Sequence, residues 1–114
     1  MACLMDNEQD FQRLCRGCTE VEITEICEYL GEWTMGTYGT VAQSVLDHAD
    51  RKGFSPLRYL RKAHNFNKRG AVRVPKSGAR SDGSIVYRKG NEFLIVRSDS
   101  YGIEKIVTYG INEE

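Results

Sequence analysis

Residues 84–109 read SIVYRKGNEFLIVRSDSYGIEKIVTY, and this stretch decides the fold. Short runs rich in isoleucine, valine and aromatic residues alternate here with turn residues, which is typical of β-strands joined by hairpins. We expect strands at Ser84–Arg88, Glu92–Arg97 and Ile103–Tyr109. The two connections between them, Lys89–Asn91 and Asp99–Gly102, both contain glycine, which favours tight turns. The stretch therefore predicts an antiparallel meander.

The same period of two extends upstream as far as Gly70. Ala71–Pro75 (AVRVP) predicts a further strand, in which Val72 and Val74 face inward and Arg73 lies on the other face. A loop from Pro75 to Gly83 then leads into the meander. The sheet therefore has four strands.

Before Gly70 the apolar residues recur at helical spacing instead. We expect helices at Asp6–Leu14, Thr19–Leu30, Thr40–Arg51 and Ser55–Phe66. Thr19 and Glu22 form a capping box, and Ser55 with Pro56 has the pattern of a helix start. Trp33, Met35 and Tyr38 fall in a link that we expect to pack under the third helix.

The apolar faces of these helices predict the core. We expect the core to contain Val21, Ile23, Ile26, Cys27, Leu30, Val41, Ala42, Val45, Leu46, Ala49, Leu57, Tyr59, Leu60, Ala63 and Phe66. The fold class is α+β, with N-terminal helices followed by a four-stranded antiparallel sheet. We expect a single domain over residues 1–114, with an acidic helical scaffold at 1–40 and a helix-plus-sheet core at 41–110.

Charge is distributed unevenly along the chain, although the net charge is zero. Residues 1–50 hold ten acidic and two basic side chains, whereas residues 51–80 hold ten basic and no acidic ones. Thirty residues without a carboxylate favour binding of a polyanion, with nucleic acid as the first candidate. The alternative is a solvated basic face that balances the acidic half.

Composition excludes several other classes. No apolar run approaches the roughly 20 residues that a membrane helix needs, and the N-terminus is acidic rather than signal-like. We therefore expect a cytoplasmic site of action and no membrane partner. Cys15 and Cys18 have a two-residue spacing that zinc sites use, but no second pair exists, so half-buried thiols are favoured over a metal site. We expect neither a metal nor a cofactor.

His48 is the first residue with catalytic interest. On a helical wheel it lies about a right angle from the middle of the apolar face, at the boundary between core and solvent. Arg51 and Lys52 follow one turn later, so a general acid or base with a lowered pKa fits this position. The competing interpretation is a partly buried histidine with a backbone partner.

An ordered set of short motifs supports a resemblance. The motifs are His48-Ala-Asp-Arg51-Lys52-Gly53-Phe54, Tyr59-x-x-x-Ala63-x-x-Phe66, Asp82-Gly83-Ser-Ile-Val-Tyr87, Asn91-Glu-Phe93-Leu-Ile-Val96 and Ile106-Val107-Thr108-Tyr109. Their order over residues 45–110 resembles the C-terminal nuclease domains of bacterial polymorphic and contact-dependent toxins, in the barnase/EndoU/colicin/RelE-like superfamily. The family differs in having lysine and histidine after the first histidine, where this chain has Arg51 and Lys52.

The resemblance implies a metal-independent endoribonuclease toxin that cleaves RNA, tRNA included, by attack of the 2′-hydroxyl to give a 2′,3′-cyclic phosphate. It implies His48 as the proton shuttle, Arg51, Lys52 and Arg80 as cations on the phosphorane, and Thr108 as the hydroxyl donor. Tyr87 and Tyr109 are the alternatives for that last role. A cognate immunity or antitoxin protein is the implied partner. We expect the RNA to contact Arg58, Arg61, Lys62, Lys68, Arg69, Arg73, Lys76 and Tyr109.

Two other functions stay open. One is a non-catalytic nucleic-acid-binding module that uses the same basic surface. Aromatic side chains are few in the basic stretch, and Tyr59 and Phe66 are expected in the core, which argues against a stacking platform for single strands. The other is a phage- or plasmid-encoded protein-binding inhibitor that works through its acidic half.

Overall fold

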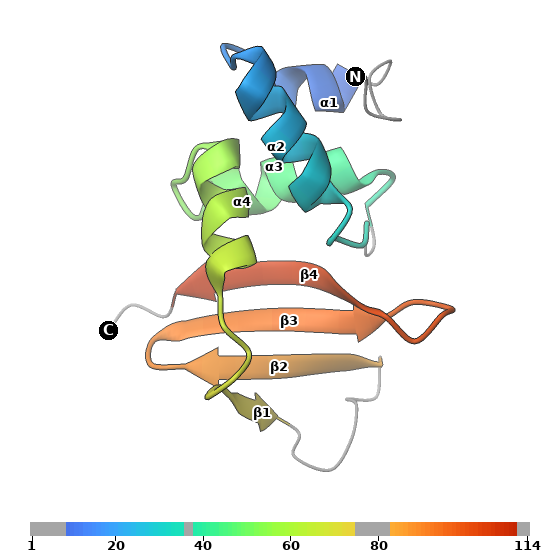
Figure 1. Cartoon of the computed structure of the whole chain (residues 1–114), viewed down its shortest axis with the longest axis vertical. Helices are drawn as coiled ribbons and strands as arrows, with labels where there is room; N and C mark the ends of the chain where they lie inside the picture. Colours follow the sequence, from blue (N-terminus) through green and yellow to red (C-terminus); the bar gives the residue numbers. More distant parts are fainter. Residues whose placement is uncertain (1–8, 36–37, 75–82, 112–114) are drawn as a thin grey trace.

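The computed structural model describes residues 9–35, 38–74 and 83–111, and Figure 1 shows helices followed by a sheet. The helices are α1 (Gln9–Leu14), α2 (Glu20–Leu30), α3 (Val41–Arg51) and α4 (Pro56–Asn65). The strands are β1 (Val72–Val74), β2 (Ser84–Lys89), β3 (Glu92–Ser98) and β4 (Glu104–Ile111). They pair antiparallel in the order β1-β2-β3-β4, which confirms the predicted α+β fold and its meander.

The helix starts follow the capping signals. Thr19 accepts from the Glu22 backbone N–H while the Glu22 carboxylate accepts from the Thr19 N–H, so both halves of the predicted capping box are present. The Thr40 side chain caps α3 by accepting from the Gln43 N–H, while the Gln43 side chain accepts from the Gly39 N–H. Ser55 stands at the N-cap of α4 without a side-chain hydrogen bond. Within the described ranges no helix is long and apolar enough to cross a membrane.

The pairing register gives the sheet two distinct faces. Tyr87, Leu94 and Tyr109 lie opposite one another on β2, β3 and β4, as do Ile85, Val96 and Ile106. These six residues share one face, and most of them belong to the core. Arg88, Phe93 and Gly110 form a row on the opposite face, and we call these three residues the Phe93 row.

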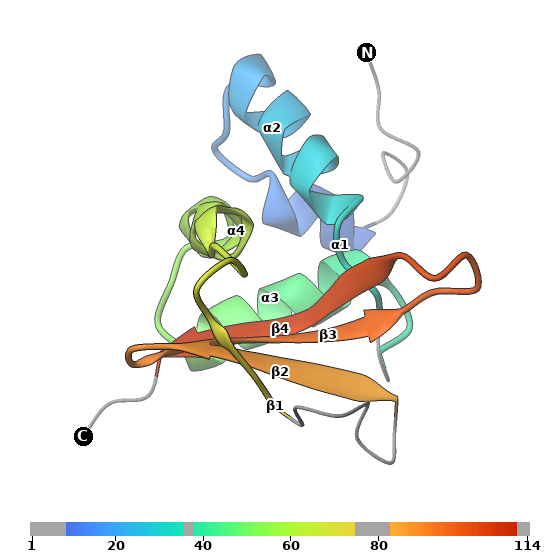
Figure 2. The ribbon, with the colours of Figure 1, turned by 60° about the horizontal axis from the view of Figure 1, so that its bottom comes forward.

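The helical layer lies on the β4 side of the sheet, as Figures 1 and 2 both show. Helices α3 and α4 contact β4, whereas α2 packs on α4 and α1 on α3. The chain after α4 crosses the sheet to reach β1 at the far edge (Figure 1). Tyr59 and Tyr109 are fully buried where α4 meets β4, and Trp33 packs against the Tyr59 ring.

The outer edge of β4 is covered. The Thr34 N–H donates to the Ile106 carbonyl at 2.8 Å, and the Ile106 N–H donates to the Glu32 carbonyl at 2.7 Å. Further along, the Tyr59 hydroxyl donates to the Tyr109 carbonyl at 2.6 Å and accepts from the Tyr109 N–H at 3.0 Å. A bulge, in which Ile95 pairs with Thr108 but Val96 pairs with Ile106, separates the two contacts.

Some core predictions were wrong. Val72 and Val74 were expected to face inward, but they are 53% and 39% exposed because their register partners, Arg88 and Val86, lie on the face opposite the core. A two-residue period in the sequence predicts that alternate residues share a face of the strand, but it does not predict which face is buried. Val21 is also outside the core, at 79% exposed, in the first turn of α2.

Candidate functional site

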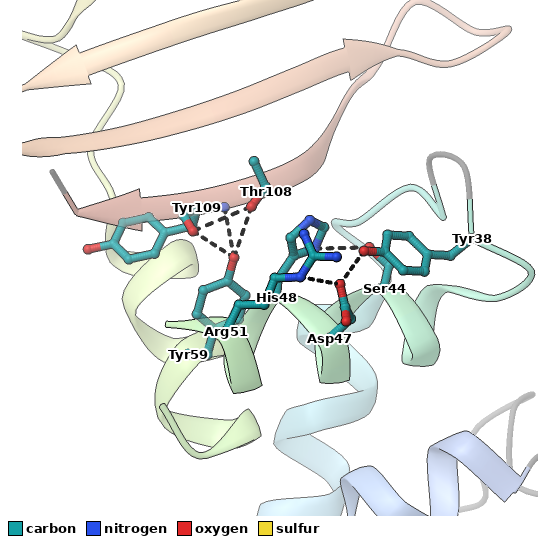
Figure 3. A network of polar contacts seen from close by, with 8 residues as sticks. All are labelled: Tyr38, Ser44, Asp47, His48, Arg51, Tyr59, Thr108 and Tyr109. Carbon is teal, nitrogen blue, oxygen red and sulfur yellow. Dashed lines mark hydrogen bonds and ion pairs between the residues drawn. The ribbon is translucent and has the colours of Figure 1, made fainter. Parts of the chain in front are cut away.

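His48 lies on the side of α3 that faces β4, and Figure 3 shows it with its neighbours. The imidazole is partly buried, as the helical wheel predicts. Its Nδ1 lies 3.3 Å from the Ser44 hydroxyl, one turn earlier on α3. The Tyr38 ring packs edge-on against the imidazole, with centroids 5.5 Å apart. These contacts fix the orientation of the imidazole and engage its Nδ1 atom. Nε2 is therefore the ring nitrogen that we consider for proton transfer.

The pKa of His48 is lowered from its ordinary value. Burial is the largest cause, and the positive charges of Lys52 and Arg51 act in the same direction. Hydrogen bonding to the Ser44 backbone and the charge of Asp47 oppose the shift. His48 is therefore neutral at pH 7 and able to accept a proton.

The Thr108 hydroxyl lies at the edge of β4, 3.2 Å from the Tyr59 hydroxyl (Figure 3). Because the Tyr59 proton is donated to the Tyr109 carbonyl, Tyr59 accepts from Thr108. Burial raises the pKa of Tyr59 to about 12, so this phenol stays protonated. Thr108 is thus oriented by Tyr59, and its hydroxyl must rotate to donate to a phosphate.

Helix α3 and strand β4 run side by side in the same direction (Figure 3). The Lys52 ammonium lies 3.2 Å from the position that a Cβ atom on Gly110 would occupy. His48 precedes Lys52 by about 6 Å of helix, and Thr108 precedes Gly110 by about 6.7 Å of strand. Figure 3 shows the His48 imidazole and the Thr108 hydroxyl between α3 and β4, on the sides of the two elements that face one another.

The basic side chains fall into two sets rather than one hollow. Arg51, Arg61 and Lys68 each pair with a carboxylate: Asp47 at 3.0 Å, Glu25 at 2.8 Å and Glu104 at 3.0 Å, respectively. Lys52, Arg58 and Lys62 instead lie over aromatic rings, 5.6 Å from the Phe93 centroid and 5.5 and 5.9 Å from that of Phe54. No ion pair within the described ranges involves these last three, which we call the unpaired cations.

Arg51 was predicted to stabilise the phosphorane, but its guanidinium is held by Asp47, which also accepts from the Tyr38 hydroxyl (Figure 3). Lys52 is therefore the cation nearest His48 that remains available. The acidic half of the chain neutralises Arg61 and, at 2.8 Å, binds the imidazole of His64 through Glu32. The alternative that the sequence left open, a basic face balanced by the acidic half, thus describes Arg51 and Arg61 but not the unpaired cations.

Tyr109 does not fit the predicted RNA surface. Its ring is fully buried and its hydroxyl donates to Glu92 at 2.5 Å, because the bulge in β4 turns it toward the core. Tyr87 is engaged likewise, with its hydroxyl 3.1 Å from both Glu104 oxygens. Arg73 shares the face of Tyr87 and is partly buried, whereas Arg69 is exposed. Lys76 and Arg80 lie outside the described residues.

Sequence reasoning missed Ser44, Tyr38 and two members of the Phe93 row. Ser44 precedes His48 by one helical turn, and that spacing was the available signal. Arg88 and Phe93 lie outside the carboxylate-free stretch, so the charge pattern did not single them out. The position of Phe93 beside Lys52, and of Arg88 beside Phe93, depends on strand pairing and packing and is visible only in the fold.

A cleft of about 450 Å³ lies on another side of α3, lined by Arg13, Tyr38, Gln43, Leu46, Asp47, Ala49, Asp50, Phe54 and Pro56. His48 and Thr108 are not among these residues, so the groups with the clearest chemistry lie outside this hollow. We therefore base the candidate site on the side chains along α3 and β4 and not on the cleft.

Metal chemistry has little support in this site. Within the described ranges, no three His, Cys, Asp or Glu side chains are grouped so that they could hold a metal ion. The pKa of the Cys18 thiol is raised by burial and by the charge of Glu22, which disfavours the thiolate that metal binding needs.

Comparison of the chain with protein-family models, curated proteins and solved structures finds no significant match to any of them.

Proposed function

We propose that the protein is a metal-independent endoribonuclease whose site consists of His48, Lys52 and Thr108. The observation that carries this proposal is a partly buried imidazole with a lowered pKa on the side of α3 that faces the Thr108 hydroxyl, with the unpaired ammonium of Lys52 four residues later. General base catalysis is most effective when the pKa of the base lies near the working pH. A cation beside the base offsets charge that develops on phosphate oxygens.

The reaction divides among these groups as follows. Nε2 of His48 takes the proton of a ribose 2′-hydroxyl while that oxygen attacks the adjacent phosphorus. Lys52 stabilises the negative charge on the phosphorane, and Thr108 donates to one of its oxygens after rotating away from Tyr59. The bond to the 5′-oxygen then breaks, and that oxygen takes a proton from His48. The products are a 2′,3′-cyclic phosphate and a 5′-hydroxyl end.

Incubation with single-stranded RNA in EDTA tests this function. We expect cleavage by the wild-type protein, a 2′,3′-cyclic phosphate on the upstream fragment, and no cleavage of a 2′-deoxy substrate. His48→Ala should slow cleavage at least 100-fold, the lower end of what a general base contributes. His64→Ala is the matched control, because His64 is exposed and bound to Glu32. Equal cleavage by both variants and wild type removes His48 from the mechanism.

A second candidate is a non-catalytic RNA-binding module. The Thr108 hydroxyl already donates to Tyr59 and so is not free to donate to a phosphate, which favours binding without catalysis. The unpaired cations remain available to bind phosphates. Binding without cleavage in the same assay selects it. Removing one cation that binds a phosphate should reduce the slope of log affinity against log salt by about 0.7 for a single strand. Lys52→Met and Arg58→Met therefore measure the contribution of each cation.

The proposed partners follow from the same surface. RNA in the cytoplasm is the proposed substrate, and a protein inhibitor with an acidic surface is the proposed regulator. Such an inhibitor gains from the unpaired cations for the same electrostatic reason as RNA. Its binding should protect Lys52, Arg58 and Lys62 from chemical modification of basic side chains.

A further inference from the structure

The Phe93 row crosses the sheet at the end nearest Lys52. Arg88 pairs with Phe93 across β2 and β3, and Phe93 pairs with Gly110 across β3 and β4. The three residues lie on the face opposite the Tyr87–Leu94–Tyr109 core row. Arg88 is exposed and Phe93 is partly exposed, so an aromatic ring and a guanidinium reach solvent side by side.

Gly110 lets the ring lie against the backbone of β4. A Cβ atom at this position would fall 2.4 Å from Cζ of Phe93 and 2.6 Å from Cε1. The same position lies 3.2 Å from the Lys52 ammonium, which is 5.6 Å from the Phe93 centroid. The ring thus has the Lys52 ammonium over it, and its register partner on the neighbouring strand is Arg88.

Aromatic rings on an open sheet face, flanked by cations, match the chemistry of single-stranded nucleic acid. A base stacks on the ring whatever its identity, while the neighbouring phosphates are attracted to ammonium and guanidinium groups. Neither Lys52 nor Arg88 has a carboxylate partner within the described ranges. The local charge therefore stays positive and selects an anionic partner.

We propose that Phe93 is a stacking platform for one base of a single-stranded RNA, with Lys52 and Arg88 contacting the phosphates on either side of it. This inference rests on the proposed function for its choice of RNA and identifies where a nucleotide next to the scissile bond binds. The next row on the same face contains Ile95 and Thr108, about 6.7 Å farther along the strands. The platform and the His48 site are thus adjacent.

Other aromatic side chains fit this role less well. Phe54 packs against the hydrophobic core, with its ring centroid 5.9 Å from that of buried Tyr59. Tyr101 is 87% exposed, but it belongs to the β3–β4 turn beside the Asp99 carboxylate, which accepts from its backbone N–H. Tyr59 and Tyr109 are fully buried. Phe93 is partly exposed and does not belong to the core cluster, and its neighbours Lys52 and Arg88 have no carboxylate partner among the described residues.

The test measures binding of a 2′-O-methyl RNA heptamer, which lacks the attacking hydroxyl and is not cleaved, by fluorescence anisotropy. We expect Phe93→Leu to weaken binding about tenfold or more, within the range found for loss of one stacked base, with the salt dependence unchanged. Phe54→Leu is the matched control and should change affinity by less than about twofold. Lys52→Met and Arg88→Met should each weaken binding and lower the salt dependence.

Phe93→Trp provides a second readout that does not depend on loss of structure. Trp33 is the chain's one tryptophan and is buried, so a second indole at position 93 should be quenched by a stacked base while the wild-type signal stays constant. On the wild-type protein, a heptamer with one abasic position should bind about tenfold more weakly than the intact one. Unchanged affinity for Phe93→Leu, together with no quenching and no abasic effect, overturns the platform.

These outcomes separate the platform from the nuclease. RNA cleavage by the wild-type protein with unchanged binding by Phe93→Leu rejects the platform and leaves the proposed function intact. Absence of any binding or cleavage of RNA by the wild-type protein rejects both. Binding that depends on Phe93 without cleavage supports the platform and selects the non-catalytic binder.

Discussion

The Phe93 ring on β3 lies so close to Gly110 on β4 that a Cβ atom at position 110 would overlap it. Gly110→Ala would insert a methyl group 2.4 Å from the ring, so the ring must move or the strands must separate. We expect a loss of roughly 1–3 kcal/mol in the free energy of unfolding, as for other overpacked sites, measured by urea denaturation.

Gly39→Ala is the control for that prediction, because a Cβ atom there would make only an ordinary contact, 3.5 Å from the Gln43 side chain. Adding Phe93→Ala to Gly110→Ala should recover part of the lost stability, since the clashing ring is then absent. A double variant that is as unstable as the sum of the two single variants would contradict the proposed clash.

Tyr59→Phe should destabilise the fold through the backbone of β4. The substitution removes the partner of both the N–H and the carbonyl of Tyr109, which lie 3.0 and 2.6 Å from the Tyr59 hydroxyl. Buried groups left without a hydrogen bond cost about 1–3 kcal/mol. We expect a loss of that size in urea denaturation and faster exchange of the Tyr109 amide proton. Tyr101→Phe, at an 87% exposed position, should change stability by less than about 0.5 kcal/mol.

His48 should make stability depend on pH. The folded-state pKa of His48 is lowered from 6.5, so below pH 6.5 the unfolded chain binds the proton more readily than the folded chain. This contribution to stability is complete above pH 6.5 and is lost as the pH falls through the lower, folded-state pKa. His48→Asn should flatten that part of the curve in denaturation series from about pH 8 to about pH 5. A wild-type curve with the opposite slope from this residue would show that His48 gains a proton on folding.

The two kinds of helix N-cap should respond differently to alanine. Thr19→Ala breaks the hydrogen bond to the Glu22 N–H and should cost about 1 kcal/mol in free energy of unfolding. Ser55→Ala removes no side-chain cap hydrogen bond and should cost no more than a few tenths of that. Equal losses for the two variants would mean that the hydroxyl of Thr19 is not what stabilises α2.

Glu25 should contribute to acid denaturation. Both of its oxygens accept from Arg61 at 2.8 Å, and the Arg61 hydrogen bonds lower the pKa of Glu25 from 4.5 to about 2. The stability gained from this pair is present above pH 4.5 and is lost as the pH falls toward 2. Glu25→Gln should therefore narrow the difference in Tm between about pH 6 and about pH 3. Glu28→Gln, at an exposed position of the same helix, should leave that difference unchanged.

Signals close together in the sequence predicted much of this fold. The capping box of Thr19 and Glu22 and the boundary position of His48 depend on residues within one helical turn, and the structure has both. The hairpins follow from glycine in short links between strands. Local spacing is sufficient here because each of these features depends on residues only a few positions apart.

Contacts between distant residues could not be predicted in the same way. Arg61 pairs with Glu25 and Lys68 with Glu104, each across 36 positions, so the stretch without acids does not reveal which cations are neutralised. The position of Phe93 beside Lys52 depends on the register of β3 with β4 and on the packing of α3 along β4. Arg51 is different, because Asp47 precedes it by four residues and the pairing could have been read from the helix.

The covered edge of β4 also bears on how copies of this protein meet at high concentration. Backbone groups on β4 already bond to the Glu32–Thr34 segment and to the Tyr59 hydroxyl, so an incoming strand finds those positions occupied. Of the described strands, β1 forms the other margin of the sheet, and it is three residues long. Short margins are poor templates for cross-β growth. We therefore expect this sheet to resist fibril formation, and we expect that resistance to depend on the hydrogen bonds of the Tyr59 hydroxyl to β4.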